Sequence, residues 1–113
     1  MQFLFIISHD ADFAPTDTLI GDIFAWIEQA TADGQRISGK PLQPPGTAST
    51  VRIRNGKRLL TDGPFSASDE QICAYELVEC SSMEEALELA ARHPMAAAAT
   101  IEVRPVWTER EAE

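Results

Sequence analysis

Residues 71–94 read QICAYELVECSSMEEALELAARHP and predict a strand that runs directly into a helix. The strand spans residues 71–79, where apolar residues recur between polar ones. Two overlapping capping boxes then start the helix, Ser81 with Glu84 and Ser82 with Glu85. The helix ends before Pro94, because a residue that precedes proline is disfavoured in helical geometry. We expect its packed face to carry Met83, Ala86, Leu87 and Ala90.

The segments on either side of this unit predict further strands. Residues 100–106 alternate between apolar and polar and predict a last strand, with Ile101, Val103 and Pro105 on one face. Residues 2–8 read QFLFIIS and predict a buried central strand near the N-terminus.

An amphipathic helix of about four turns is predicted after the first strand. Thr16 or Asp17 caps it, and it ends near Gly34. The apolar residues at helical spacing are Leu19, Ile20, Ile23, Phe24, Ile27 and Ala30. Trp26 falls off this stripe, so we expect it to be either half-exposed or covered by a partner. A short strand is expected around residues 36–38.

Residues 50–61 read TVRIRNGKRLLT and predict a β-hairpin. Asn55-Gly56 supplies the two positive-φ positions of a type I′ turn. The register that follows opposes Arg52 to Leu59 and Arg54 to Lys57. One face therefore carries Arg52, Arg54 and Lys57, which either clamp an anion or form a solvated surface that discourages edge pairing. The other face, which we expect to point toward the core, carries Val51, Ile53 and Leu60.

The order of these elements indicates an α+β, ferredoxin-like β-α-β-β-α-β fold with an inserted β-hairpin. Residues 1–113 form a single domain, because chains divide into several domains only at greater length. A sheet with helices on one face leaves its other face uncovered, and that face must be buried somewhere. We therefore expect a homodimer, in a dimeric α/β-barrel-type assembly.

The chain carries 9 basic and 18 acidic side chains, which give a formal net charge of −9. Such a surface repels phosphate backbones and anionic lipids, so neither nucleic acid nor a membrane is an expected partner. The start MQFLFIISHD has no basic region and only a short apolar run, which favours a cytoplasmic location. Cys73 and Cys80 are expected to be buried or half-buried thiols in a reducing compartment.

The predicted topology brings three segments that are distant in sequence to one end of the sheet. They contain His9-Asp10, Asp62-Gly63-Pro64-Phe65 and Arg92-His93-Pro94. His93 is either a general acid or base, or a helix C-terminal histidine favoured by the helix dipole. Asp62 either orients a histidine or a ligand, or serves the turn chemistry of its Asp-Gly-Pro sequence.

Other candidate sites in the sequence are weaker. His9 either joins the predicted cluster or lies at a solvated loop entry. A divalent metal held by His9, Asp62 and His93 has no HxH or HExxH spacing to support it, so we expect no metal. None of the six glycines is spaced for a phosphate-binding loop, and we expect no cofactor.

Several strings at matched spacing form a specific pattern along nearly the whole chain. They are Gln43-Pro44-Pro45, Thr50-Val51-Arg52, Thr61-Asp62-Gly63-Pro64-Phe65, Glu70-Gln71, Glu85-Ala86-Leu87, Ala91-Arg92-His93-Pro94 and Glu102-Val103-Arg104-Pro105. Together they resemble the YCII-related family, in its DGPF-motif branch. The resemblance implies a ferredoxin-like fold, usually a dimer with two sheets face to face, and an active-site cleft between sheet and helices.

The resemblance also implies a range of functions. Most members have no established reaction, and one relative in the wider family eliminates chloride from a chlorinated hydroxyquinol. Members of the DGPF branch are often encoded beside extracytoplasmic-function sigma factors. The chain departs from the family in two places: Ile72-Cys73-Ala74-Tyr75 replaces a usual Gly-Gly or Gly-Tyr, and Ser68-Asp69-Glu70 lacks a usual lysine. In addition, the predicted first helix has no histidine, and His93 stands where the YCII branch has the aspartate of a His–Asp dyad.

Two functions are therefore expected. The first is a cofactor-free small-molecule enzyme that performs proton transfer, elimination or isomerisation on a hydroxylated or aromatic compound, with His93 and Asp62 as catalytic residues. Its substrate-binding residues would be His9, Gly63, Pro64, Phe65 and Tyr75. The alternative is a non-catalytic ligand- or protein-binding module linked to sigma-factor regulation, in which the acidic surface meets a basic partner.

Overall fold

The computed structural model describes residues 1–108, which form a four-stranded antiparallel sheet and a separate hairpin. The sheet has the order β2-β5-β1-β6 and contains β1 (Gln2–His9), β2 (Arg36–Pro41), β5 (Gln71–Glu79) and β6 (Thr100–Pro105). The helices are α1 (Asp17–Ala32), α2 (Met83–Arg92) and α3 (Pro94–Ala98). The hairpin consists of β3 (Ser49–Arg54) and β4 (Lys57–Asp62) and follows a short 3₁₀ helix, η1 (Pro45–Thr47). The predicted α+β class with antiparallel strands is confirmed.

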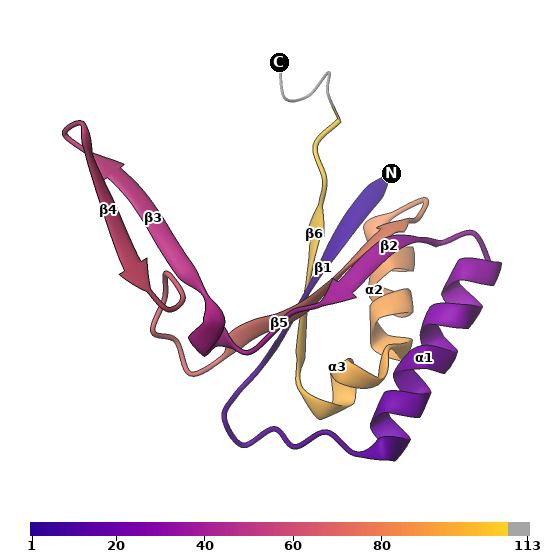
Figure 1. Cartoon of the computed structure of the whole chain (residues 1–113). Helices are drawn as coiled ribbons and strands as arrows, with labels where there is room; N and C mark the ends of the chain where they lie inside the picture. The colour runs from indigo at the N-terminus through magenta and orange to yellow at the C-terminus, as the bar shows by residue number, and fades with distance from the viewer. Residues whose placement is uncertain (109–113) are drawn as a thin grey trace.

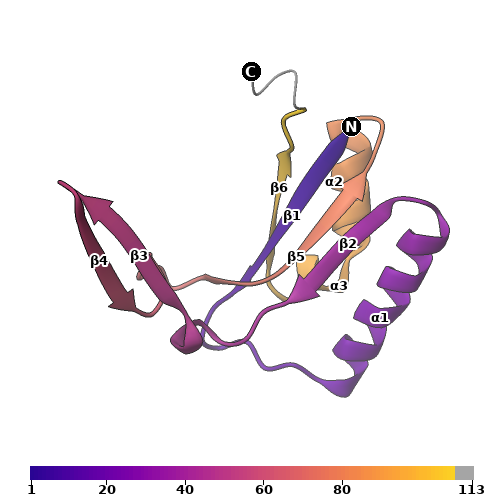
Figure 2. The ribbon, with the colours of Figure 1, turned by 45° about the horizontal axis from the view of Figure 1, so that its top comes forward.

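The helices all lie on one face of the sheet, as Figures 1 and 2 show. Side chains alternate along a strand, and Phe3, Phe5 and Ile7 of β1 point toward the helices and are buried. The core cluster around the two phenylalanines also contains Trp26, Ala30, Val78, Cys80, Ala86, Leu89 and Ala90. The alternate positions of the two central strands face the other side of the sheet and are half-buried: Leu4, Ile6, Tyr75 and Leu77. No helix within residues 1–108 is long and apolar enough to cross a membrane.

Helix α1 begins and ends where the sequence predicts, but its buried face differs. The Thr16 hydroxyl accepts a hydrogen bond from the Leu19 backbone N–H at 3.1 Å, which confirms this cap. The expectation for Trp26 was wrong, because its side chain is only 7% exposed. Its indole Nε1 donates to the Leu89 carbonyl oxygen at 3.2 Å, so the one polar atom of the ring is satisfied inside the core. Ile20 and Phe24, two residues of the predicted stripe, are exposed instead.

Helix α2 ends at Arg92, before Pro94, as predicted. Its buried residues are Ala86, Leu89 and Ala90, while Met83 and Leu87 of the predicted face are exposed. The spacing of the three buried positions is i, i+3 and i+4, so they form one stripe. The prediction was wrong about which leucine faces inward, since Leu89 lies beside Trp26 and Leu87 does not belong to that stripe.

The hairpin has the predicted turn and register but not the predicted packing. Asn55 and Gly56 have φ values of 53° and 76°, as a type I′ turn requires. The register opposes Arg52 to Leu59 and Arg54 to Lys57, as expected. The apolar face does not reach the core, however, because the hairpin leaves the sheet and extends away from the helices (Figure 1). The side chains that were expected to be buried are therefore exposed: Val51, Ile53 and Leu60.

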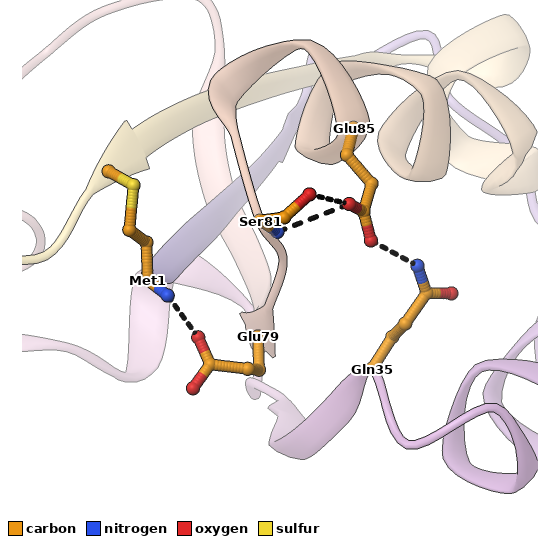
Figure 3. Close-up of polar contacts among 5 residues, drawn as sticks. All are labelled: Met1, Gln35, Glu79, Ser81 and Glu85. Carbon is orange, nitrogen blue, oxygen red and sulfur yellow. Dashed lines mark hydrogen bonds and ion pairs between the residues drawn. The ribbon is translucent and has the colours of Figure 1, made fainter.

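Two sets of polar contacts join the ends of β1, β2, β5 and α2 at one corner of the sheet (Figure 3). The N-terminal ammonium of Met1 pairs with the Glu79 carboxylate at 2.6 Å. The Glu85 carboxylate accepts hydrogen bonds from the backbone N–H and hydroxyl of Ser81 and, at 3.1 Å, from the side-chain amide of Gln35. The bonds from Ser81 and Gln35 lower the pKa of Glu85. The Met1 pair connects the start of β1 to the end of β5, and the Glu85 bonds connect the first turn of α2 to the residues just before β2 and just after β5.

Candidate functional site

A cavity of about 420 Å³ lies where α1 faces the sheet, bounded by the ends of β1 and β2, by β5 and by the junction of α2 and α3. Its walls are mainly apolar and are lined by Ile7, Phe13, Pro15, Leu19, Ile20, Ile23, Phe24, Ile27, Pro41, Leu42, Ala74 and Met95. Ile20 and Phe24, which leave the core stripe of α1, therefore help to form this cavity. The lining side chains with a titratable group are His9, Cys73, Glu76 and His93. An apolar cavity with a few polar groups is typical of a small-molecule site.

His93 connects α2 to α3 and is only 2% exposed. Its Nδ1 atom accepts a hydrogen bond from the Met95 backbone N–H at 3.0 Å, and its ring lies 4.5 Å from the Trp26 ring. Burial lowers the pKa of His93 to about 4, so the ring is neutral at pH 7. Because Nδ1 accepts a hydrogen bond, this geometry assigns the single ring proton to Nε2.

Glu76 was not among the predicted site residues, yet it is buried on the helix-facing side of β5, with 5% of its surface exposed. Arg36 donates from Nε to its Oε2 at 2.6 Å and from Nη2 to the Gly39 carbonyl oxygen at 3.1 Å. Burial raises the pKa of Glu76, and the Arg36 bond and charge oppose that shift. A charged residue in phase with the buried Val78 was the sequence signal that could have identified it.

Gly39 gives the Glu76 carboxylate the space it occupies. A Cβ atom at this position would lie 2.0 Å from Glu76 Oε2 and 2.6 Å from the Tyr75 carbonyl oxygen. The edge strand β2 thus contributes both the cation that holds the carboxylate and the glycine that makes room for it.

His9 and Cys73 complete the polar lining of the cavity. His9 is half-buried, stacks on Phe13 with ring centroids 4.5 Å apart, and has its Nδ1 2.8 Å from the Asp10 carbonyl oxygen. Cys73 is half-buried, as predicted, and burial raises its pKa. The protonated thiol is the form present at neutral pH, and this form is a poor nucleophile.

The structure separates several residues that were expected to converge. His9 and His93 line the same cavity, but Asp62 is exposed at the end of β4 and lines neither this cavity nor its neighbour. The reason is that Asp62 belongs to β4 of the hairpin, which is separate from the four-stranded sheet. Gly63 follows with a φ of 100° and forms part of the exit turn, as its predicted turn chemistry requires.

Pro64 and Phe65 line a second, wider hollow at the root of the hairpin, of about 540 Å³. Phe65 is 71% exposed, and none of the residues that line this hollow is buried. Tyr75 pairs with Ile6 and faces the side of the sheet opposite the cavity. The first cavity is therefore the stronger candidate site, because it alone of the two encloses buried ionisable groups.

Within residues 1–108, no cluster of three or more His, Cys, Asp and Glu side chains is arranged to hold a metal ion. Of the three residues considered for such a site, Asp62 is apart from the two histidines. The polar atoms of the cavity are thus a neutral imidazole, a carboxylate paired with arginine, a thiol and a second histidine at the rim.

Comparisons with known proteins place this geometry in context. Over 49 residues, 43% of the chain, the sequence is 39% identical to an uncharacterized protein, R00369, of Rhizobium meliloti (strain 1021). That match spans 40% of the length of the relative. A solved structure of similar fold is 5-chloro-2-hydroxyhydroquinone dehydrochlorinase (TftG) from Burkholderia phenoliruptrix AC1100, in complex with 2,5-dihydroxybenzoquinone.

The likeness to that enzyme has a TM-score of 0.52 and 17% sequence identity, and it covers 97% of each chain. At this identity the likeness shows the fold alone. The family model for the YCII-related domain matches residues 1–110, almost the entire sequence. The chain therefore belongs to the YCII-related family, as the strings in its sequence indicated.

Proposed function

We propose that this domain binds a small cyclic organic compound with hydroxyl or carbonyl groups in the cavity beside α1 and promotes proton transfer on it. Elimination and isomerisation are the reactions that such proton transfer supports, and they need only groups that the chain itself supplies. His93 and Glu76 are the buried ionisable residues of the cavity wall, and His9 is a half-buried one. The roles first expected for Asp62, Phe65 and Tyr75 find no support in their positions.

The observation that carries this proposal is the burial of two ionisable side chains, Glu76 and His93, in one mainly apolar cavity. Burying such groups costs stability, and perturbed groups of this kind concentrate at functional sites. The volume of about 420 Å³ suits a single substituted ring. The structural neighbour TftG, named for its action on a chlorinated hydroxyhydroquinone, supports the choice of hydroxylated ring compounds.

A thermal-shift screen over phenols, quinols, cyclic hydroxyketones and hydroxy acids tests the proposal, because a ligand that binds only the folded state raises the Tm. We expect hits among the ring compounds. Ile20→Glu, which places a charge in the cavity wall, should abolish their shifts, whereas Phe65→Ala in the second hollow should keep them. Shifts lost on Phe65→Ala and kept on Ile20→Glu would place the ligand at the hairpin root and refute the proposed site.

The free hairpin favours a second function, a module that binds another protein. Its apolar side chains Val51, Ile53 and Leu60 are exposed, and its other face is basic. Ile53→Lys should then abolish capture of a partner such as a sigma factor while leaving the ligand shifts of the cavity unchanged. Capture that does not depend on this face would count against the hairpin as the binding surface.

A further inference from the structure

We propose a division of labour inside the cavity: Glu76 accepts the proton from the ligand, and His93 donates a hydrogen bond from Nε2 to the ligand oxygen that gains charge. This inference rests on the proposed function and assigns its chemistry to atoms. It differs from the expectation from the sequence, in which His93 is the general acid or base and Asp62 orients that histidine or the ligand.

The hydrogen bonds of His93 fix its role as a donor. Nδ1 is occupied by the Met95 backbone N–H, so the neutral ring carries its proton on Nε2. No group within residues 1–108 forms a hydrogen bond with Nε2. Every fully buried side-chain nitrogen or oxygen of these residues has a hydrogen-bond partner. Because Nε2 has none, it is not fully buried and must reach accessible surface. His93 is 2% exposed and lines the cavity, so we assign the accessible surface of Nε2 to the cavity.

The same reasoning identifies a free acceptor on Glu76. Arg36 occupies Oε2, and within residues 1–108 no group forms a hydrogen bond with Oε1. Because fully buried polar side-chain atoms are all paired in this part of the chain, Oε1 keeps accessible surface, which we assign to the cavity that Glu76 lines. An ionised carboxylate only accepts hydrogen bonds, so the cavity offers a ligand one donor and one acceptor from two different elements.

Arg36 and Gly39 act as positioning residues for the carboxylate. The bond from Arg36 to Oε2 fixes the orientation of the group, and the missing side chain at Gly39 leaves room for it. Burial raises the pKa of Glu76, which makes its carboxylate a stronger base than a solvated one, while the Arg36 charge keeps the ionised form accessible. Two of the other titratable groups that line the cavity, His93 and Cys73, are neutral at pH 7.

The proton-transfer step balances without a further reactant. In a cyclic α-hydroxyketone, the C–H bond beside the carbonyl breaks and its proton forms an O–H bond on Glu76 Oε1. The electron pair of the broken bond moves into the ring as a C=C bond, and the carbonyl oxygen becomes an enediolate oxygen that accepts the His93 Nε2–H bond. The hydroxyl proton then passes to the former carbonyl oxygen, and the proton on Glu76 returns to the carbon that bears it. The carbon that lost its hydrogen becomes the new carbonyl, which gives the isomeric hydroxyketone and restores the carboxylate.

The experiment uses 2-hydroxycyclohexanone as the probe and the complete chain in D₂O. Exchange of the C2 hydrogen is followed by NMR, and binding is measured by calorimetry. We expect the wild-type protein to bind the probe and catalyse exchange. Glu76→Gln should lower the exchange rate at least 100-fold with a Kd within a few-fold of wild type. The matched variant Glu79→Gln, on the same strand but outside the cavity, should exchange at the wild-type rate.

Two further variants keep the assignment testable. Glu76→Asp retains the charge that pairs with Arg36 but shortens the side chain, so it should fold and exchange at least 10-fold more slowly. His93→Asn should weaken binding and slow exchange together, because the bond to the ligand oxygen is lost in both states. Wild-type exchange rates in both Glu76 variants would overturn the assignment and leave the proposed function standing. A wild-type protein that neither binds nor exchanges the probe would overturn both.

Discussion

At the scale of single residues, His93 combines three roles that sequence alone assigns to different residue types. It ends α2, its Nδ1 caps α3 by accepting the Met95 N–H, and its ring packs against Trp26. These contacts require the neutral ring, since a second ring proton would face the Met95 N–H. The histidine is therefore built into the fold as a neutral group, and its free Nε2–H is available to the cavity.

This neutral state makes stability depend on pH. The folded-state pKa of His93 is about 4, below the value of 6.5 that an unfolded histidine has. As the pH falls, the histidine therefore takes up its proton in the unfolded chain before it does so in the folded chain. The contribution of neutral His93 to the free energy of unfolding is complete above pH 6.5 and is lost between about pH 6.5 and 4. His93→Asn keeps a cap but cannot titrate, so its loss of stability over this range should be smaller by up to about 3 kcal/mol. The free energy of unfolding of both proteins is measured by urea denaturation at each pH. The same pH dependence for both proteins would contradict this prediction.

Two glycines that look alike in the sequence should respond oppositely to alanine. Gly39→Ala forces a Cβ atom onto the Glu76 carboxylate and the Tyr75 carbonyl, and we expect a loss of about 1–3 kcal/mol. Gly21, inside α1, has no atom within 4 Å of such a Cβ, so Gly21→Ala should raise stability by about 0.5–1 kcal/mol. Urea denaturation measures both changes. A Gly39→Ala variant as stable as the wild-type protein would show that Gly39 is not needed to make room for the Glu76 carboxylate.

At the scale of elements, local rules predicted the ends of the elements better than their faces. Thr16, Pro94 and Asn55-Gly56 act within a few residues of themselves, so their caps, stops and turns are visible in the sequence. Which stripe of α1 is buried depends on a contact between Trp26 and Leu89, 63 positions apart, that no local pattern contains. The hairpin shows the same limit, since its register is local and its departure from the sheet is not.

The start of α2 offers a matched pair of acidic residues. The sequence allows capping by both Glu84 and Glu85, whereas the structure shows the carboxylate of Glu85 bound to Ser81 and Gln35. Glu85→Ala should therefore lower the Tm by a few degrees, and Glu84→Ala should change it much less. Ser82→Ala removes the hydroxyl that accepts from the Glu85 N–H and should cost about 1 kcal/mol. Equal changes in Tm for Glu84→Ala and Glu85→Ala would contradict the assignment of these hydrogen bonds to Glu85.

At the scale of the whole molecule, the chain is flat and open. Its extents are 47 × 41 × 18 Å, and its radius of gyration is 16.1 Å, where a compact domain of this length has about 13 Å. Its accessible surface is 8063 Å², where a monomer of this mass exposes about 6100 Å². The excess resembles the surface that one or two protein interfaces bury. The uncovered face of the sheet and the exposed hairpin both contribute to this surface.

We therefore expect a homodimer that covers the open face of the sheet, where the half-buried Leu4, Ile6 and Leu77 lie. Sedimentation equilibrium at micromolar concentration should give twice the chain mass. Leu77→Arg on that face should give monomers, whereas Leu87→Arg on the outside of α2 should remain dimeric. A wild-type monomer under these conditions would refute the dimer.

Much of the candidate site could not be predicted from the sequence, because it depends on contacts between residues that are far apart in the chain. His9 and His93 were placed together correctly, because the order of the elements brings the ends of β1 and α2 to one edge. Asp62 was grouped with them because residues 62–65 lead toward the strand of residues 71–79, but Asp62 ends β4 of a hairpin that is separate from the sheet. Glu76 was overlooked because a single inward acidic residue on a strand becomes meaningful only once Arg36 and Gly39 of β2 are seen beside it.

His93 is proposed to present an Nε2–H to a ligand in the cavity. Long-range ¹H–¹⁵N spectra of the imidazoles report tautomer and hydrogen bonding directly, and titration with 2-hydroxycyclohexanone adds the response to a ligand. We predict that His93 is the Nε2–H tautomer from pH 5 to 8 and that its Nε2 resonance shifts as the probe saturates the protein. A His93 that titrates near neutral pH, carries its proton on Nδ1, or does not respond to bound probe would contradict the account.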